Sequence, residues 1–273
     1  DAYLSPFGNG TFRFHVKIYR KRDWPEDGKL VFVNRKLLEH QIGCAKMIAF
    51  DRTDAFFHNG FLLEECLPGE TADRMVFDAE TGKEFYKKLA LLVSKIHRIP
   101  LENYGYIGNG TASHSSFIEF MEDKYDEITK GLINKKRFDP NSLLEIKQQV
   151  IRRLQPCESL PSVLNHGDLS TKNVMVDQQG ELALIDWDDA MACNWIADIS
   201  RMTYWMKFHY DDHEYAMYRN TFLEHYSTDS SKIFDALENT FHVWIGLDHL
   251  NYFADKPQYE KILAYFNETM DKL

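Results

Sequence analysis

The most informative part of the sequence is residues 164–190, which read Leu-Asn-His-Gly-Asp-Leu-Ser-Thr-Lys-Asn-Val-Met-Val-Asp-Gln-Gln-Gly-Glu-Leu-Ala-Leu-Ile-Asp-Trp-Asp-Asp-Ala. Asn173 follows Asp168 by five residues, and Asp186 comes at the end of the next apolar run. The runs 173–177 and 181–186 predict two short strands, and the Gln-Gln-Gly between them predicts a tight turn. Because such a hairpin folds the chain back on itself, we expect Asn173 and Asp186 to face one site.

These three polar side chains are of the types that phosphoryl transfer requires. The reaction needs little covalent chemistry from the protein, but it needs an oriented nucleophile and neutralisation of the phosphate charge. A carboxylate such as that of Asp168 can orient an acceptor hydroxyl and take its proton. The amide oxygen of Asn173 and the carboxylate of Asp186 suit Mg²⁺, a hard cation that prefers oxygen ligands.

The same residues carry a resemblance to a known family. His-Gly-Asp, four residues, Asn and then Ile-Asp-Trp resembles the signature of aminoglycoside phosphotransferases and their relatives, which share the protein-kinase-like fold. The resemblance implies that Asp168 is the catalytic base, that Asn173 and Asp186 bind Mg²⁺, and that His166 supports the loop. It also implies a nucleotide cofactor, ATP with GTP as an alternative, and a small-molecule acceptor.

Flanking segments extend the resemblance over most of the chain. Residues 61–69 resemble the family's hinge, where backbone groups around Glu65, Cys66 and Leu67 meet adenine; an ordinary strand ending in a turn is the alternative. Asp198 stands where the family places an Asp that braces the catalytic loop from beneath, although a helix-capping role is also open. Residues 244–250 resemble the closing helix of hygromycin B phosphotransferase, so we expect the chain to be nearest that branch.

Lys17 matches the strand lysine that contacts the α- and β-phosphates in the family, with an exposed lysine on an edge strand as the alternative. The helix glutamate that normally pairs with this lysine would fall near Asn34, which is not acidic. Glu39 is the only carboxylate between Asp27 and Asp51. We therefore expect Glu39 to pair with the strand lysine.

The region before Lys17 is short for this fold. Kinase-like folds place two strands and a phosphate-covering loop before the strand lysine, whereas sixteen residues precede Lys17 here. Residues 7–10, Phe-Gly-Asn-Gly, are either a remnant of that loop or the turn into the Lys17 strand, and we favour the turn. The protein extends further upstream or its phosphate loop is abbreviated. A missing loop would favour a catalytically impaired, kinase-like binding protein.

The expected fold class is α+β, in the bilobal protein-kinase-like arrangement. A small N-terminal lobe with an antiparallel sheet and one helix should span residues 1–66 and bind the nucleotide. A larger, mostly helical C-terminal lobe, residues 67–273, should carry the catalytic loop and the acceptor. In the first lobe, residue patterns predict strands at 11–19, 46–50 and 60–66 and a helix at 30–42.

Capping patterns predict where three helices of the second lobe begin. Thr81 with Glu84, and Ser116 with Glu119, fit the capping box in which two side chains satisfy the first free backbone N–H groups. Asn141 can cap a third helix. Apolar residues at helical spacing follow each of these starts, and helical patterns resume from about residue 194.

Composition excludes several classes of partner. The formal net charge of −10 argues against nucleic acid, because phosphate binding needs clustered Lys and Arg. No window approaches the eighteen or so apolar residues of a membrane span, so we expect no membrane partner. Four scattered cysteines without a C-x-x-C pair favour a reducing cytoplasm. We expect a monomer or a homodimer.

The acceptor side is predicted from carboxylates in the second lobe. Carboxylates pair with ammonium groups and set specificity by their placement. The candidates are Asp188, Asp189, Asp211, Asp212 and Asp248. We expect phosphorylation of a hydroxyl of an aminoglycoside or a related cationic or sugar substrate, with a choline-like amine or a methylthioribose-like sugar as the alternative.

His209 and His213 raise a different class of function, zinc-dependent hydrolysis. These residues stand four apart, a spacing that binds zinc on a helix in some hydrolases. The intervening residues are Tyr-Asp-Asp, so no Glu follows His209 directly, and an exposed polar helix face is the simpler interpretation.

Overall fold

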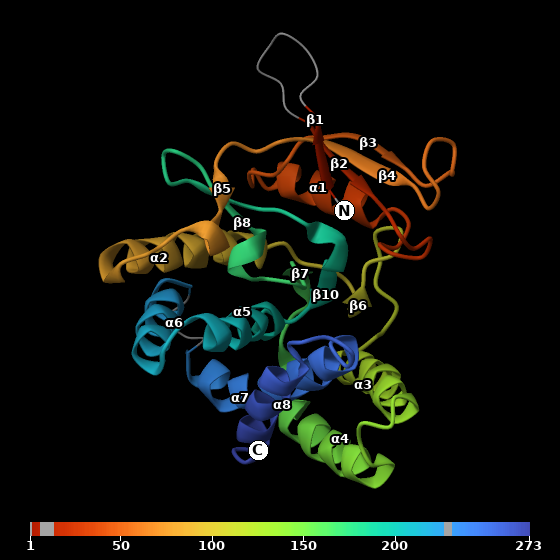
Figure 1. Cartoon of the computed structure of the whole chain (residues 1–273), viewed down its shortest axis with the longest axis vertical. Helices are drawn as coiled ribbons and strands as arrows, with labels where there is room; N and C mark the ends of the chain where they lie inside the picture. The colour runs from red at the N-terminus through yellow and green to blue at the C-terminus, as the bar shows by residue number, and fades with distance from the viewer. Residues whose placement is uncertain (1, 6–13, 227–230) are drawn as a thin grey trace.

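The structure is a computed structural model that describes residues 2–5, 14–226 and 231–273. Its N-terminal part is a four-stranded antiparallel sheet with one helix beside it (Figure 1). In the order β1-β2-β4-β3, the strands are Ala2–Ser5, Phe14–Ile18, Phe61–Glu65 and Met47–Asp51, and helix α1 is Lys29–Glu39. The strands and the helix expected in this lobe are therefore formed. The turn expected at residues 7–10 lies outside the described residues.

The register of this sheet decides which side chains share a face. In the β2–β4 pair, Lys17 lies opposite Leu62 and His15 lies opposite Glu64. Side chains along a strand alternate between the two faces, so residues two apart point the same way. Lys17, Leu62, His15 and Glu64 consequently occupy one face of the sheet. All four line the cleft described below.

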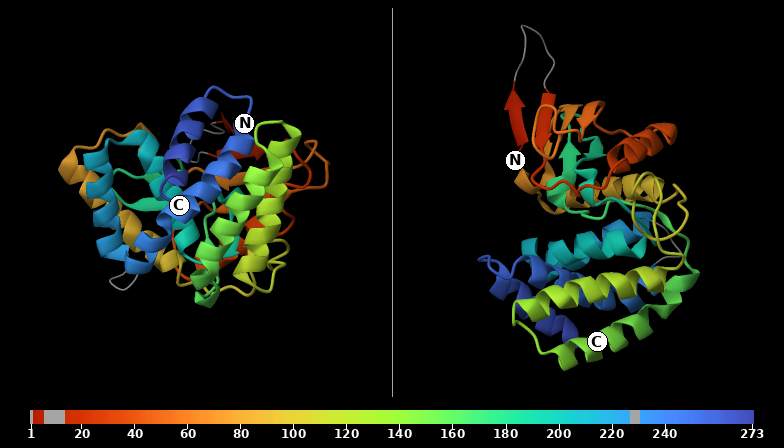
Figure 2. Two further views of the ribbon diagram at one scale, coloured as in Figure 1. Left: turned by 90° about the horizontal axis from the view of Figure 1, so that it is seen from below. Right: turned by 90° about the vertical axis from the view of Figure 1, so that its right-hand side faces the viewer.

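The C-terminal part is mainly helical, and the right-hand view of Figure 2 shows most of its helices below the N-terminal sheet. Its helices are α2 (Ala79–Ile96), α3 (Phe117–Asn134), α4 (Pro140–Leu154), α5 (Ile196–His209), α6 (Asp212–Tyr226), α7 (Ser231–Tyr252) and α8 (Tyr259–Met270). Two small antiparallel sheets have the orders β5-β8-β9 and β6-β10-β7. Their strands are β5 (Glu70–Thr71), β6 (Gly105–Tyr106), β7 (Val163–Asn165), β8 (Val174–Val176), β9 (Leu182–Leu184) and β10 (Met191–Cys193). In the described part of the chain, no helix is long and apolar enough to cross a membrane.

Two of the three predicted helix starts are displaced. Asp78 caps α2 by accepting the backbone N–H of Thr81, whose hydroxyl accepts the backbone N–H of Asp78, so the capping box begins three residues earlier than expected. Asp139, not Asn141, caps α4. Ser116 caps α3 as predicted. Asp and Asn are about equally good caps, so spacing alone does not separate neighbouring candidates.

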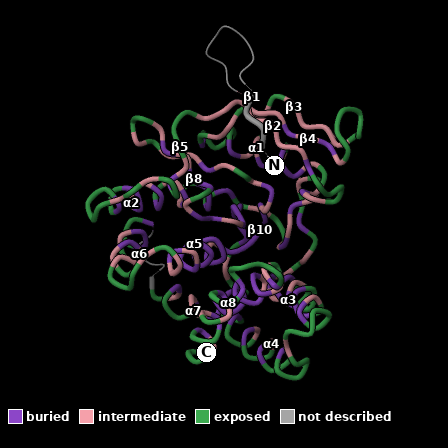
Figure 3. Tube along the Cα trace, in the orientation of Figure 1, coloured by how far each residue is buried: buried purple, intermediate pink, exposed green. Residues whose placement is uncertain are grey.

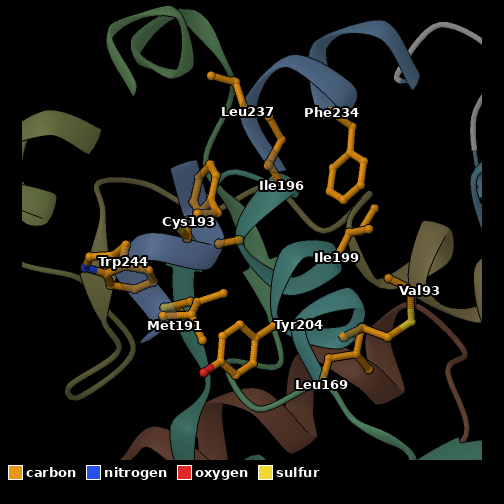
Figure 4. Close-up of a cluster of buried hydrophobic side chains, with 14 of the residues drawn as sticks. Val93, Leu169, Met191, Cys193, Ile196, Ile199, Tyr204, Phe234, Leu237 and Trp244 are labelled. Atoms are coloured by element: carbon orange, nitrogen blue, oxygen red, sulfur yellow. The ribbon is translucent and has the colours of Figure 1, made fainter. Parts of the chain in front are cut away.

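The core runs through α5, which is buried along most of its length (Figure 3). Ile199 and Tyr204 of this helix pack with Val93 of α2, Met191 of β10 and Leu169 of the predicted catalytic loop (Figure 4). Leu169 is fully buried. Burying a leucine side chain stabilises a fold by about 1.5–3 kcal/mol. The residue that follows Asp168 is thus anchored in the core of the larger lobe.

Candidate active site

The principal cavity among the described residues is a cleft of about 1160 Å³ between the N-terminal sheet and the β8–β9 hairpin. The sheet side contributes the face that carries Lys17 and Glu64, together with α1 residues such as Leu30 and Val33. Residues 65–71, which connect the two lobes, form another wall. The opposite wall comes from the hairpin and the segment after it, including Asn173 and Asp186. The cleft therefore brings the predicted hinge, strand lysine and metal ligands to one cavity.

The predicted catalytic carboxylate lies on a loop at the edge of this cleft. The side-chain amide of Asn173 donates to the backbone oxygen of Asp168 at 2.8 Å and to its carboxylate at 3.1 Å. Lys172 pairs with the same carboxylate at 2.9 Å. Both partners of Asp168 line the cleft. The carboxylate is thus held in a fixed direction between the cavity and the helical lobe.

Asp198 holds this loop from below. Its carboxylate accepts the backbone N–H groups of His166 at 2.6 Å and Gly167 at 2.8 Å, and lies 3.2 Å from His97 Nε2. The Tyr226 hydroxyl is 2.8 Å from the other His97 ring nitrogen, Nδ1. Burial alone would raise the pKa of Asp198, but these hydrogen bonds and the nearby histidines lower it. Asp198 is therefore an ionised, buried carboxylate on which the loop backbone rests.

His166 connects the catalytic loop to the strand that ends at Asp186. Its Nε2 lies 2.8 Å from the backbone oxygen of Ile185, and the backbone N–H of Asp168 points at its Nδ1 at 3.3 Å. The imidazole also packs against Trp187, with ring centroids 4.7 Å apart. The side chain of His166 thus sets the spacing between the two acidic segments.

Lys17 reaches across the cleft to two carboxylates. Its ammonium group lies 2.6 Å from Asp186 Oδ1 and 2.6 Å from Asp188 Oδ2. Burial alone would lower the pKa of Lys17, but the two carboxylates outweigh it and raise the pKa. Burial would likewise raise the pKa of Asp186, and the charge and hydrogen bond of Lys17 lower it. Lys17 and Asp186 are therefore both charged and both directed into the cleft.

The predicted pairing of Lys17 with Glu39 is not formed. Glu39 is the last residue of α1, is half exposed and pairs with Arg35 and Lys36 of the same helix. Asn34, at the position where the family's glutamate was sought, donates to the backbone oxygen of Ala45 at 3.0 Å. The carboxylates that pair with Lys17 are those of Asp186 and Asp188, which follow β9, because Lys17 points across the cleft towards the second lobe.

Lys29 is a buried cation that no sequence pattern marks as functional. It is the first residue of α1, and its ammonium group donates to the backbone oxygen of Asp188 at 2.9 Å and pairs with Glu26. It lies over the rings of Trp24 and Tyr106, at 4.4 and 5.0 Å from their centroids. A lysine at a helix start ordinarily lies in solvent, whereas Lys29 is fully buried and ties α1 to the segment after Asp186.

The donor groups fit a magnesium site, although no ligand is part of the structure. Asn173 directs its amide nitrogen to Asp168, so its oxygen is the atom that remains for a cation. Asp186 is ionised and half exposed to the cleft. Mg²⁺ is commonly held by one or two protein oxygens together with phosphate oxygens and water. The described residues contain no group of three His, Cys, Asp or Glu that could hold a metal, so a transition-metal cage is not formed there.

Two of the five predicted acceptor contacts, Asp189 and Asp248, lie near Arg201 and interact with its charge. Asp189 is partly buried, and desolvation together with the charge of Asp168 raises its pKa to about 6. Asp248 of α7 lies 3.7 Å from the guanidinium of Arg201, which is itself hydrogen-bonded to His249. The charges of Asp248 and Asp168 raise the pKa of Arg201 despite its burial. Asp189, Arg201 and Asp248 thus extend from the catalytic loop into the helical lobe.

The other three predicted acceptor contacts have partners elsewhere in the structure. Asp188 is buried against Lys17 and accepts from the Tyr19 hydroxyl at 3.4 Å, so it belongs to the cleft wall. Asp211 caps the first turn of α6 by accepting the backbone N–H of Glu214. Asp212 is almost fully exposed and pairs with Lys207. Asp211 and Asp212 stand at the start of α6, where Asp211 bonds to the first helical turn and Asp212 pairs with Lys207.

The zinc interpretation of His209 and His213 fails for a structural reason. His209 is the last residue of α5, whereas His213 lies in the first turn of α6. The helix is broken between them, so the spacing of four residues does not place both side chains on one helix face. The absence of a three-ligand cluster among the described residues agrees with this.

The fold and the site define a class of enzyme, the two-lobed phosphotransferases with a protein-kinase-like fold. A model of the phosphotransferase enzyme family (APH) matches residues 5–232, and the chain belongs to this family. A search of curated proteins found no match. The expected fold and the expected phosphotransferase class are confirmed.

Solved structures agree with the fold. A thermostable mutant of aminoglycoside phosphotransferase APH(4)-Ia, in ternary complex with ADP and hygromycin B, aligns with a TM-score of 0.72 at 14% identity, over 100% of this chain and 92% of that one. Choline kinase LicA from Streptococcus pneumoniae aligns with a TM-score of 0.67 at 17% identity, over 100% of this chain and 90% of that one. Ethanolamine kinase from Plasmodium vivax aligns with a TM-score of 0.64 at 14% identity, over 98% of this chain and 82% of that one. At these identities the similarity establishes the fold.

Proposed function

We propose that this protein is a small-molecule kinase that transfers the γ-phosphoryl group of a nucleoside triphosphate, with Mg²⁺, to a hydroxyl of its acceptor. The observation that carries the proposal is the single cleft in which Lys17, Asn173 and Asp186 converge beside the loop of Asp168. Family membership and the kinases among the structural neighbours support it.

In this proposal each charged group has one task. Lys17 binds the α- and β-phosphates, and residues 65–67 bind the base. Mg²⁺, when bound, neutralises phosphate charge, and Asn173 and Asp186 would hold it. Asp168 accepts a hydrogen bond from the acceptor hydroxyl, orients it and takes its proton as the phosphoryl group transfers. His166 and Asp198 hold the loop in the position that places Asp168 beside the acceptor hydroxyl.

Replacement of Lys17 should weaken nucleotide binding strongly. A Lys17→Met variant loses the cation that faces the phosphates and leaves Asp186 and Asp188 without it, so we expect the Kd for Mg²⁺–ADP to rise at least tenfold, about 1.4 kcal/mol. Calorimetric titration of the purified variant measures this. A Glu39→Gln variant is the matched control and should bind like the wild type; weakened binding in Glu39→Gln with normal binding in Lys17→Met would reverse the assignment.

We propose a cationic hydroxyl compound as the acceptor, bound by Asp248 and Asp189 beside Asp168. Aminoglycosides are one such class, and the complex of the APH(4)-Ia mutant with hygromycin B supports it. The balance of charges also favours a second candidate, a small amino alcohol. Arg201 pairs with Asp248, and the cation of Lys124 lies near enough for Asp248 to raise its pKa despite burial. Such neutralisation leaves room for one or two ammonium groups more readily than for a polycation.

Neutralising Asp248 should impair acceptor binding and leave the nucleotide site intact. In an Asp248→Asn variant we expect KM for a cationic acceptor to rise about tenfold, because a charge-assisted contact contributes about 1.5–3 kcal/mol, while KM for the nucleotide stays unchanged. Steady-state kinetics with both substrates varied gives the two values. Asp212→Asn removes the same charge from an exposed helix start and serves as the control. An equal rise of KM in both variants would contradict a specific role for Asp248.

A further inference from the structure

A hydrogen-bonded pair of polar side chains lies inside the nucleotide cleft and takes no part in the proposed phosphoryl transfer. His15 Nδ1 of β2 is 3.0 Å from Glu64 Oε1 of β4, and the two residues are direct cross-strand partners. Their side chains are about one-quarter exposed, and both line the cleft. They share the sheet face of Lys17, two cross-strand pairs closer to the lobe connection. The pair therefore stands between the phosphate end of the cavity and residues 65–67.

The surroundings of Glu64 are mostly apolar. Met47 is its cross-strand partner on β3, and the cleft wall around it includes the side chains of Leu62 and Cys44. The negative charge of Glu64 adds to burial in raising the pKa of the Cys44 thiol. One carboxylate oxygen of Glu64 is occupied by His15, which leaves the second oxygen as an acceptor on the cleft wall.

We propose that Glu64 selects adenine over guanine by accepting a hydrogen bond from the 6-amino group of the base. This inference rests on the proposed function, because it assumes that the base edge meets residues 65–67. Glu64 directly precedes these residues and faces the cleft, so it meets the substituent at position 6. Adenine presents a donor there, whereas guanine and hypoxanthine present an oxygen. A carboxylate is acceptor-only when ionised, so it attracts the first and repels the others.

His15 has a positioning role in this scheme. Its ring nitrogen holds one oxygen of Glu64, which limits the rotation of the carboxylate and leaves the other oxygen directed at the base. The pairing also compensates the burial of a charge in the cleft wall, which would otherwise be costly. The two residues thus form a small recognition element built on rigid strands.

The competing arrangement is a guanine base turned so that its N1–H and 2-amino groups meet Glu64. A carboxylate can bind those two donors together. This arrangement predicts that the 2-amino group matters, and that guanine nucleotides bind better than hypoxanthine nucleotides. Binding of ADP, GDP and IDP therefore separates the two arrangements, since IDP shares the 6-oxygen of GDP and lacks its 2-amino group.

Calorimetric titration of the whole chain with Mg²⁺ and each diphosphate tests the inference without any acceptor. We expect the wild type to bind ADP about ten- to hundredfold more tightly than GDP or IDP, the range of one hydrogen bond to a charged group. Glu64→Gln should reduce this preference to within about threefold, because an amide can also donate to a 6-oxygen. Glu64→Met should weaken the binding of ADP without strengthening the binding of GDP.

Glu84→Gln makes the same chemical change on the exposed face of α2, where Glu84 pairs with Lys87, and should leave the preference unchanged. Thermal melting of each variant verifies that it is folded. An ADP preference that survives in Glu64→Gln, or a wild type that prefers GDP to both ADP and IDP, would overturn the role of Glu64. Failure of the wild type to bind any of the three would instead contradict the proposed function on which the inference rests.

Discussion

An Asp168→Asn variant is expected to lose most of its turnover while it continues to bind nucleotide. The amide keeps the size of the side chain and one acceptor oxygen, but it cannot take the proton of an acceptor hydroxyl. Loss of a positioned general base lowers kcat about 10²- to 10⁴-fold. Nucleotide affinity should stay within about threefold of the wild type, because the proposed phosphate contacts come from Lys17 and the metal ligands. Steady-state kinetics and calorimetry measure the two quantities separately.

The control for this variant is Asp255→Asn, which removes a carboxylate that is largely exposed beside Arg137. It should leave both kcat and nucleotide affinity unchanged. Near-normal turnover in Asp168→Asn would refute the assignment of the base. A loss of nucleotide affinity as large as the loss of kcat would mean that Asp168 acts on the phosphates or the metal instead.

Asp198→Ala should produce the largest loss of stability among single carboxylate changes. Two backbone N–H groups and the ring of His97 would lose their common partner inside the protein. Breaking such a buried, hydrogen-bonded pair costs about 3–5 kcal/mol. Turnover should fall as well, because the loop of Asp168 rests on these bonds. Urea unfolding measures the free-energy change, with an unchanged m-value as the sign that the transition is comparable.

Asp78→Ala is the matched control, because Asp78 is a plain helix cap on α2. Loss of a cap costs about 1 kcal/mol. If Asp198→Ala lowered the free energy of unfolding by only about 1 kcal/mol, the result would favour a helix-capping role for Asp198. It would contradict the role of Asp198 as a support for the loop of Asp168.

The pH dependence of stability offers an independent check on Asp198. Its pKa is lowered in the folded state, so the folded protein binds this proton less readily than the unfolded chain does. The stabilisation is therefore fully present above the unfolded pKa of about 4 and is lost as the pH falls through the folded value. Between pH 5 and pH 3 the wild type should lose more unfolding free energy than Asp198→Ala. Parallel losses would show that Asp198 is not the carboxylate responsible.

The sequence was sufficient for the features that depend on local spacing. The hairpin of β8 and β9 follows from two apolar runs and a glycine turn, and it brings Asn173 and Asp186 to the same cleft. The strand that carries Lys17 follows from its β-branched and aromatic pattern. The order of lobes follows from the resemblance, which rests on the same motif.

Features that depend on contacts between lobes could not be read from the sequence. Glu39 is the nearest carboxylate along the chain to the expected position, yet the partners of Lys17 are Asp186 and Asp188. Lys29 looks like an ordinary first residue of a helix, and only the packing of Trp24 and Tyr106 around it reveals its burial. Sequence proximity likewise does not show that a helix begins at Asp212, where Asp211 accepts the backbone N–H of Glu214 and Asp212 pairs with Lys207.

The central claim is that Asp168 directs phosphoryl transfer to a small-molecule hydroxyl. The most direct test is mass spectrometry of products after incubation with ATP, Mg²⁺ and a panel of acceptors: aminoglycosides including hygromycin B, choline, ethanolamine and sugars. We expect at least one acceptor to gain a single phosphoryl group, and we expect Asp168→Asn to abolish the product while still binding Mg²⁺–ADP. Transfer that persists in Asp168→Asn, or a wild type that binds Mg²⁺–ADP and phosphorylates no hydroxyl compound in the panel, would contradict this claim.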